Sequence, residues 1–372
     1  MFWALCEARA VTAARDAIVR EEGKVMTPPT ARVSRREFVG GLIGLAASAF
    51  AARPSAGQDE SAGTRSRIDV HHHIAPPRYI AAVGATWSLP SVLMNWTPAR
   101  SLQDMDAAGV ATSITSITTP GLWFGDDSAA RRLARECNEY AARLVVDFPG
   151  RFGMFAAVPM PDVAGTLREI TYALDTLHAD GVALFTSYGD RWLGDAAFTP
   201  LMEELNRRKA VCYTHPTTPR CCHNLVLDVP DPIIEYGTDT TRTIASLVFS
   251  GTSVRFPEIR FVFSHAGGSA PFLAERLTRL PLANPLLASR VPKGVLHELQ
   301  RFHYDVAQAA HPMALASLLR LAPISQVLFG TDFPFRTSAD HVQGLAAYGF
   351  TSSDRRAIER DNARRLLSYP RG

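Results

Sequence analysis

The sequence has only three lysines, Lys24, Lys209 and Lys293, and five cysteines among 372 residues. Cys221 and Cys222 are adjacent and no Cys-x-x-Cys occurs, which argues against a disulfide framework and predicts free thiols. Acidic and basic residues nearly balance at a formal net charge of +3, so nothing indicates a nucleic-acid or anionic-membrane partner. No apolar run approaches the roughly 20 residues of a membrane-spanning helix.

Residues 1–51 are typical of a bacterial export signal. Ser34-Arg35-Arg36-Glu37-Phe38-Val39 resembles a twin-arginine motif, and a short apolar run, Val39–Phe50, follows it. Ala49-Phe50-Ala51 supplies a small-x-small cleavage site, and Met26 is a candidate true start. We therefore expect a periplasmic or otherwise exported protein, the alternative being an uncleaved N-terminal anchor.

Residues 52–66 are small and polar and are expected to form a linker, followed by one catalytic domain at 67–372. There, apolar β-branched runs alternate with helical patterns, which predicts eight strand–helix units and a TIM-type (β/α)8 barrel in the α/β class. No Gly-x-Gly-x-x-Gly follows an early strand, which weakens the doubly wound, nucleotide-binding alternative. The predicted strands are Ile68–His73, Ala111–Ile117, Phe152–Val158, Val182–Thr186, Val211–His215, Ile259–His265, Phe302–Val306 and Gln326–Gly330.

Helical periodicity occupies the intervals between these strands. Thr97-Pro98 and Thr199-Pro200 each place a capping hydroxyl before a proline suited to a first helical turn. Three longer connections are expected to fold over the catalytic face: Ile74–Asn95, Pro216–Thr238 and Asn284–His297. The predicted helices are Arg131–Val146, Asp162–Leu177, Thr240–Ser250, Pro271–Leu280, Met313–Leu321 and Asp354–Leu367.

The first predicted strand ends in three histidines, Ile68-Asp69-Val70-His71-His72-His73. Side chains alternate along a strand, so His71 and His73 share one face and His72 takes the other. Two imidazoles on one face can bind the same divalent ion. The alternative is a histidine cluster without a ligand role. Further metal-binding residues at the ends of later strands would favour the metal site.

Later strands bring more metal-type residues to the same barrel end. His215 ends the fifth predicted strand, His265 ends the sixth, and Asp332 follows the eighth. Chemistry in such barrels gathers at the carboxyl ends of the strands. The pattern therefore predicts one metal-dependent active site.

These motifs together resemble the amidohydrolase superfamily: Asp-x-His-x-His, His-Pro after strand five, Ser-His-Ala-Gly-Gly and Gly-Thr-Asp-Phe-Pro. They look most like its decarboxylase branch, which holds aminocarboxymuconate-semialdehyde, γ-resorcylate and 6-methylsalicylate decarboxylases. Two segments look closest to the 6-methylsalicylate type, Thr186–Asp190 and Asp239–Arg242.

The resemblance also implies roles for individual residues. His71, His73, His215 and Asp332 become metal ligands, and His265 becomes a catalytic histidine beside the metal. His72 is expected to be structural.

One metal ion per chain is expected. Binuclear members of the superfamily bridge two metals with a carboxylated lysine after strand four, where this chain has Leu184-Phe185-Thr186. Three imidazoles and one carboxylate suit Zn²⁺ with a position left open. Manganese and cobalt remain alternatives, because ligand type alone does not select the metal.

Arg276 lies eleven residues after His265. The semialdehyde decarboxylase has an arginine at similar spacing that reaches a neighbouring subunit's site to bind carboxylate. The resemblance therefore implies a homodimer with Arg276 as a substrate-binding residue, and the alternative is a solvated helix arginine.

The leading functional hypothesis is non-oxidative decarboxylation of a small aromatic or unsaturated carboxylic acid, such as an ortho-hydroxybenzoate. His265 and Asp332 are the candidates for delivering a proton to the carbon that loses its carboxylate. A hydrolase that attacks a lactone or amide with metal-bound hydroxide is the alternative. A metal-binding periplasmic protein without catalysis is a third reading.

Overall fold

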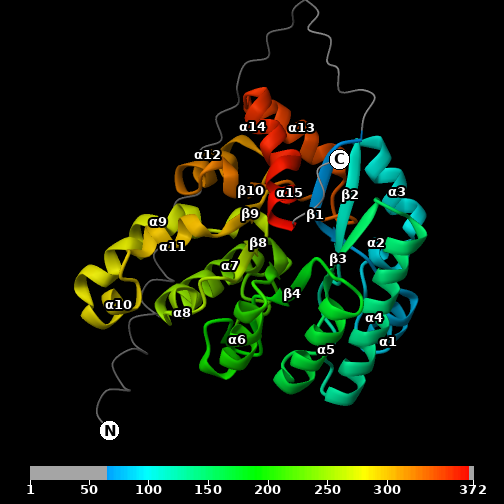
Figure 1. The fold of residues 1–372 in the computed structure, drawn as a ribbon, viewed down its shortest axis with the longest axis horizontal. Helices are drawn as coiled ribbons and strands as arrows, with labels where there is room; N and C mark the ends of the chain where they lie inside the picture. The colour runs from blue at the N-terminus through cyan, green and yellow to red at the C-terminus, as the bar shows by residue number, and fades with distance from the viewer. Residues whose placement is uncertain (1–64, 368–372) are drawn as a thin grey trace, which may run out of the picture. The chain divides into compact units, whose positions relative to one another are not determined.

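The computed structural model describes residues 65–367. The predicted signal segment (1–51) and most of the predicted linker (52–66) lie outside the described residues. Eight parallel strands form one sheet in the order β1-β2-β3-β4-β7-β8-β9-β10 (Figure 1). Their bounds are β1 Arg67–His73, β2 Val110–Ser116, β3 Phe152–Ala156, β4 Gly181–Phe185, β7 Val211–His215, β8 Arg260–Phe263, β9 His303–Asp305 and β10 Val327–Leu328.

The sheet closes where the chain beyond β10 returns to β1. Val70 N donates to Phe329 O at 3.0 Å, and Asp332 N donates to His71 O at 2.8 Å. His72 and Phe333 form a parallel bridge at the same seam. This arrangement confirms the predicted (β/α)8 barrel.

Helices follow the strands in the alternation that the sequence predicts, and they surround the barrel in Figure 1. They are α1 Pro77–Gly84, α2 Ser91–Met94, α3 Pro98–Ala107, α4 Asp127–Asp147, α5 Val163–Asp175, α6 Thr199–Arg207, α7 Pro232–Phe249, α8 Thr252–Arg255, α9 Ala270–Arg279, α10 Pro285–Arg290, α11 Val295–Arg301, α12 Pro312–Leu321, α13 Ser338–Tyr348, α14 Ser352–Arg356 and α15 Asn362–Leu367.

The helix boundaries follow local capping chemistry. The Thr97 side chain caps α3 by accepting from Arg100 N, as predicted. The prediction for Thr199 is wrong, because Thr199 is the first residue of α6 and a short 3-10 turn capped by Asp195 precedes it. The predicted loop Pro216–Thr238 contains the first turns of α7, which begins at Pro232.

Several further elements were not anticipated. The connection 74–95 contains α1 and α2, the connection 284–297 contains α10 and the start of α11, and a small antiparallel hairpin follows β4. The hairpin pairs β5 (Ser187–Tyr188) with β6 (Arg191–Trp192). Strands of two residues carry too little alternation to be recognised from sequence.

A β-bulge in β1 separates the barrel core from the histidines. Asp69 pairs with Ser113 of β2 but His72 pairs with Thr115, so β1 has one extra residue. The Asp69 carboxylate holds the bulge by accepting from His71 N at 3.0 Å. It also accepts from Thr331 N at 3.1 Å across the seam.

Apolar side chains fill the barrel interior below the bulge. Tyr213 stacks on Phe155 with ring centroids 5.1 Å apart, and α15 contributes Leu366 at the base. Arg260, at the start of β8, fixes α15 there by donating to Leu366 O at 2.6 Å. The interior cluster comprises Ile68, Val70, Ile114, Phe155, Val211, Tyr213, Val262, Leu328, Ala363 and Leu366.

The predictions about membrane-spanning helices and about cysteines can be compared with the structure of residues 65–367. Within that range no helix combines the length and apolar character needed to cross a bilayer. The four cysteines in the same range are free thiols.

Candidate metal centre

Five predicted site residues converge at the carboxyl ends of the barrel strands. His71 and His73 end β1, His215 ends β7, His265 follows β8, and Asp332 follows β10. The side chains of His71, His215, His265 and Asp332 offer ligand atoms within 4.8 Å of one another. His73 belongs to the same group, which we call the His/Asp cluster.

Short distances tie His73 into this cluster. Its Nε2 lies 3.0 Å from Nε2 of His71 and 3.1 Å from Oδ1 of Asp332. Nε2 of His265 lies 3.4 Å from Oδ2 of Asp332. The geometry brings together all the predicted ligands, and it places His265 near enough to be either a ligand or an acid–base group.

Oxygen partners orient the three imidazoles through Nδ1. The partner is Oδ2 of Asp305 at 2.9 Å for His71, Oγ of Ser116 at 3.1 Å for His73 and Pro216 O at 2.8 Å for His215. Because these oxygens accept, they place the proton on Nδ1 and leave Nε2 to face the cluster. Nε2 of His215 is buried with no hydrogen-bond partner in the structure. A divalent cation would satisfy these nitrogens, so the donor set fits a metal ion.

Electrostatics inside the cluster favours cation binding. Burial raises the pKa of Asp332, but the neighbouring His71 charge and the histidine hydrogen bonds lower it by more. The pKa of Asp332 is therefore held well below its usual value. Burial lowers the pKa of His73 to about 4. For His71, burial opposes the charged form, yet the carboxylates of Asp305 and Asp332 raise its pKa to about 10. A carboxylate and a neutral imidazole are the forms that bind metal, so Asp332 and His73 are already in those forms, whereas a metal ion would displace a proton from His71.

His72 sits on the opposite side of β1, among structural partners. Its Nδ1 lies 3.1 Å from Oδ2 of Asp69, and its Nε2 lies 2.8 Å from Oγ of Ser101. Its ring stacks on Phe333 at 4.6 Å. Both nitrogens are occupied, so no lone pair is left for a metal.

Asp305 and Gln308 are functional candidates that sequence reasoning did not select. Oδ1 of Asp305 accepts from His265 N at 3.0 Å while its other oxygen holds His71. Nε2 of Gln308 donates to Oδ2 of Asp332 at 2.9 Å. Asp305 ends β9, so the rule that selected the other strand-end residues would also have selected Asp305.

Left-handed backbone conformations concentrate at the cluster. His265, Gln308 and Asp332 have φ values of +53°, +56° and +62°. Such conformations cost energy in residues with a side chain and persist where their surroundings hold them. Their occurrence at three contacting residues indicates that this rim is shaped for its side chains.

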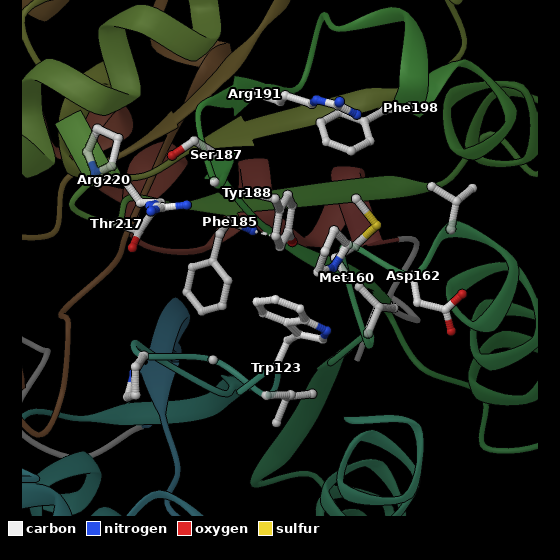
Figure 2. A pocket seen from close by; sticks show the side chains of 18 of the residues that line it. Trp123, Met160, Asp162, Phe185, Ser187, Tyr188, Arg191, Phe198, Thr217 and Arg220 are labelled. Atoms are coloured by element: carbon white, nitrogen blue, oxygen red, sulfur yellow. Dashed lines mark hydrogen bonds between the residues drawn. The ribbon is translucent and has the colours of Figure 1, made fainter. Parts of the chain in front are cut away.

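A cavity of about 820 Å³ opens beside the cluster, between the loops after β2, β3, β4 and β7 (Figure 2). Trp123, Phe185, Tyr188 and Phe198 give it aromatic walls, and Arg191 and Arg220 supply positive charge. This volume suits a small-molecule ligand.

Phe185 lies between this cavity and the cluster. Its ring centroid is 6.2 Å from that of His215 and 6.2 Å from that of Tyr188. A gap of about 20 Å³ behind Phe185 is lined by both His215 and Tyr188. The cavity and the cluster are therefore adjacent compartments, and Phe185 forms part of the wall they share.

The two segments that resembled the 6-methylsalicylate type contact each other. Buried Asp239 of α7 accepts hydrogen bonds from Thr186 Oγ1, from Ser187 Oγ at 3.0 Å and from Trp192 Nε1 at 2.6 Å. Tyr188 Oη accepts from Phe185 N at 2.9 Å. This network fixes the hairpin that carries part of the cavity wall.

Arg276 and the two lysines of the described chain, Lys209 and Lys293, lie away from the cluster. Arg276 is an exposed residue of α9 and does not line the cavity. Lys209 pairs with Glu258 at 3.2 Å on the surface. β4 ends at Phe185, so the described chain places no lysine where a second metal would need one.

Comparisons with known proteins agree with this geometry. A family profile described as Amidohydrolase matches residues 68–368. A decarboxylase of Aspergillus niger is 40% identical over 325 residues, 82% of this chain and 88% of that protein. A 6-methylsalicylic acid decarboxylase of Aspergillus aculeatus is 39% identical over 277 residues, 72% of this chain and 84% of that protein.

Solved structures share the fold. A dihydroxybenzoic acid decarboxylase of a Polaromonas species, solved with manganese and the inhibitor 2-nitroresorcinol, is 21% identical with a TM-score of 0.72. The match covers 83% of this chain and 98% of that one.

Proposed function

Because the chain belongs to the amidohydrolase family, we propose that it is a metal-dependent, non-oxidative decarboxylase of a small aromatic or unsaturated carboxylic acid. An ortho-hydroxybenzoate such as 6-methylsalicylate is the favoured substrate, since relatives of 39–40% identity include decarboxylases and one named for that acid. The observation that carries the proposal is the convergence of the His/Asp cluster beside an aromatic-walled cavity.

His71, His73, His215 and Asp332 would hold one divalent ion, with Zn²⁺ favoured by three imidazoles and one carboxylate and with manganese or cobalt as alternatives. When bound, the ion acts as a Lewis acid on the phenolate or carboxylate oxygens of the substrate. The buried, unpartnered Nε2 of His215 supports this ligand set.

The residues around the ion would manage the proton. The ring carbon that bears the carboxylate gains a proton, then the carbon–carboxylate bond breaks and its electron pair returns to the ring as CO₂ leaves. His265 and Asp332 lie 3.4 Å apart and are placed to exchange that proton. Gln308 holds the Asp332 oxygen that faces His265, and Asp305 holds the backbone of His265.

A substrate panel tests the reaction class. Metal-loaded protein is incubated with hydroxybenzoates and with aryl lactones, and CO₂ release and lactone opening are measured in parallel. We expect CO₂ from at least one ortho-hydroxybenzoate and no ring opening. Lactone or amide hydrolysis without CO₂ would instead establish the hydrolase alternative.

Arg276 would act in a homodimer by reaching the partner's site. Its exposure on α9, outside its own chain's cavity, supports an action across subunits. Mixing inactive Arg276→Ala and His71→Ala chains should restore part of the activity, since one site in a mixed dimer is intact. Full activity of Arg276→Ala alone would exclude this role.

We also propose that residues 1–51 direct twin-arginine export to the periplasm. The support is the Arg35-Arg36 pair followed by a short apolar run. Replacing both arginines by lysine should retain the protein in the cytoplasm. N-terminal sequencing of the exported protein tests cleavage near Ala51, and an uncleaved wild-type chain in the cytoplasm would refute the proposal.

A further inference from the structure

Arg220 is a solvent-exposed cation that lines the cavity and has no carboxylate partner among residues 65–367. It begins the short 3-10 turn Arg220–Cys222 in the loop after β7, five residues beyond His215. In Figure 2 its guanidinium lies near Thr217 and extends toward Phe185 and Tyr188. Within residues 65–367 its side chain makes no hydrogen bond or ion pair.

The charge of the cavity wall is positive. Asp162 is the carboxylate among the lining residues, and Arg131 pairs with it at 2.5 Å. Asp162 also accepts from Gly165 N at 3.0 Å, which caps α5. Arg191 and Arg220 have no such acidic partner in the described chain. An anionic ligand would find two guanidinium groups and one neutralised carboxylate here.

The surroundings of Arg220 suit an aromatic acid in particular. Phe185 and Tyr188 offer ring surfaces beside it, and Trp123 faces the same space (Figure 2). A planar guanidinium binds a carboxylate through two parallel hydrogen bonds, which orients the acid as well as holding it. Among the two arginines, Arg220 is the one whose loop continues directly from His215.

We propose that Arg220 binds the carboxylate of aromatic acids in the cavity outside Phe185, in a binding step that is distinct from the reaction at the His/Asp cluster and that selects acids over neutral aromatics. The ligand class rests on the proposed function, but the binding step needs no decarboxylation. Arg220 acts within its own chain, which distinguishes it from Arg276.

Equilibrium binding of an unreactive pair of probes tests this role. Benzoate and its neutral analogue benzamide are titrated into the full-length, metal-loaded protein, and quenching of tryptophan fluorescence is followed, because Trp87 and Trp123 line the cavity. The variants are Arg220→Met, Arg220→Lys and the control Arg320→Met. Arg320 is an exposed arginine of α12 that does not line the cavity.

A charge-assisted hydrogen-bonded pair predicts a benzoate Kd about 10- to 100-fold higher in Arg220→Met. Benzamide binding should change less than about twofold, Arg220→Lys should recover part of the loss, and Arg320→Met should match the wild type. Unchanged benzoate binding in Arg220→Met overturns the proposal. So does an equal loss of benzoate and benzamide, which would mean that Arg220 only shapes the cavity.

This result and the reaction test fail independently. If Arg220-dependent benzoate binding is found but no hydroxybenzoate releases CO₂, the carboxylate subsite stands and the decarboxylase proposal falls. If CO₂ is released but benzoate binding does not depend on Arg220, the decarboxylase proposal stands and the carboxylate subsite falls.

Discussion

At the residue scale, hydrogen-bond partners decide which histidine can bind a metal. In His71 and His215, Nδ1 is hydrogen-bonded to an oxygen acceptor and Nε2 faces the cluster. In His72, both ring nitrogens are hydrogen-bonded, one to Asp69 and one to Ser101. Neighbours in one tripeptide therefore differ in function because their partners differ.

Removing a proposed metal ligand should empty the proposed metal site. Elemental analysis of His71→Ala or His215→Ala should find well below one equivalent of metal per chain, with activity lost in parallel. His72→Ala should keep its metal but lose on the order of 2 kcal/mol of unfolding free energy, since it removes one hydrogen bond each from buried Asp69 and buried Ser101. Two equivalents of metal in the wild type would contradict the single-ion site.

His265 should behave differently from the ligands. A positioned acid–base group contributes roughly 10²–10⁴-fold, so His265→Asn should lose kcat by about that factor. Near-stoichiometric metal should remain, because four other donors are present in the cluster. A metal-free His265→Asn protein would make His265 a ligand and displace one of those four.

At the scale of elements, the hairpin of β5 and β6 depends on one buried carboxylate. Asp239 of α7 collects donors from both strands and from the end of β4. The hairpin in turn positions Tyr188 against Phe185. A helix residue outside the His/Asp cluster thus helps to fix the shape of the cavity wall.

Asp239→Ala should therefore weaken both the fold and substrate binding. It leaves three buried or half-buried donors unpaired, so urea unfolding should show a loss of about 3 kcal/mol. KM should rise more than kcat falls, because the wall moves while the cluster stays intact. Asp190→Ala, an exposed change in the same hairpin, should leave stability and KM unaltered.

The sequence predicts these elements unevenly, and the reasons are physical. The long strands and helices are recognisable because periodicity repeats over many residues. The hairpin and α10 are too short to show a period, and α7 begins earlier than its apolar pattern because Pro232 starts the helix. Asp305 lay within a predicted strand end, whereas the relation of Gln308 to Asp332 depends on a left-handed turn that no pattern reveals.

At the scale of the whole barrel, the end opposite the cluster carries its own titrating group. His303 begins β9, and burial together with the charges of Arg260 and Arg365 lowers its pKa to about 4. Its Nδ1 has no hydrogen-bond partner. The unfolded chain, with an ordinary histidine pKa of about 6.5, takes up this proton at higher pH than the folded protein does.

Stability should consequently fall as the pH drops from about 6.5 toward 4. The pKa difference predicts a contribution of His303 to this loss of about 2 kcal/mol by pH 5. Urea unfolding at pH 7 and pH 5 should show a smaller difference in unfolding free energy for His303→Gln than for the wild type. The control His178→Gln, at an exposed position, should show the same difference as the wild type. Equal pH dependence in all three proteins would contradict the prediction.

The closed barrel was thus accessible from strand counting and from strand-end chemistry, while the contacts that close it were not. Backbone hydrogen bonds join β1 to the segment after β10, and Asp69 adds a side-chain link to Thr331. Those partners lie 262 residues apart, beyond the reach of any local pattern.

The bulge in β1 has a consequence for building metal centres into other barrels. In a regular strand, side chains alternate between the barrel interior and the surrounding helices. Ile68 and Val70 face the interior, so His71 and His73 would face the helices if β1 were regular. The extra residue after Asp69 shifts the alternation of side chains by one position, so that Val70 packs in the barrel interior and His71 joins the His/Asp cluster. The portable unit is therefore not two histidines but the segment Asp69–His73 together with Thr331, which locks the phase shift in place. Grafts that copy the histidines alone should yield a folded barrel with an imidazole pair turned away from its mouth.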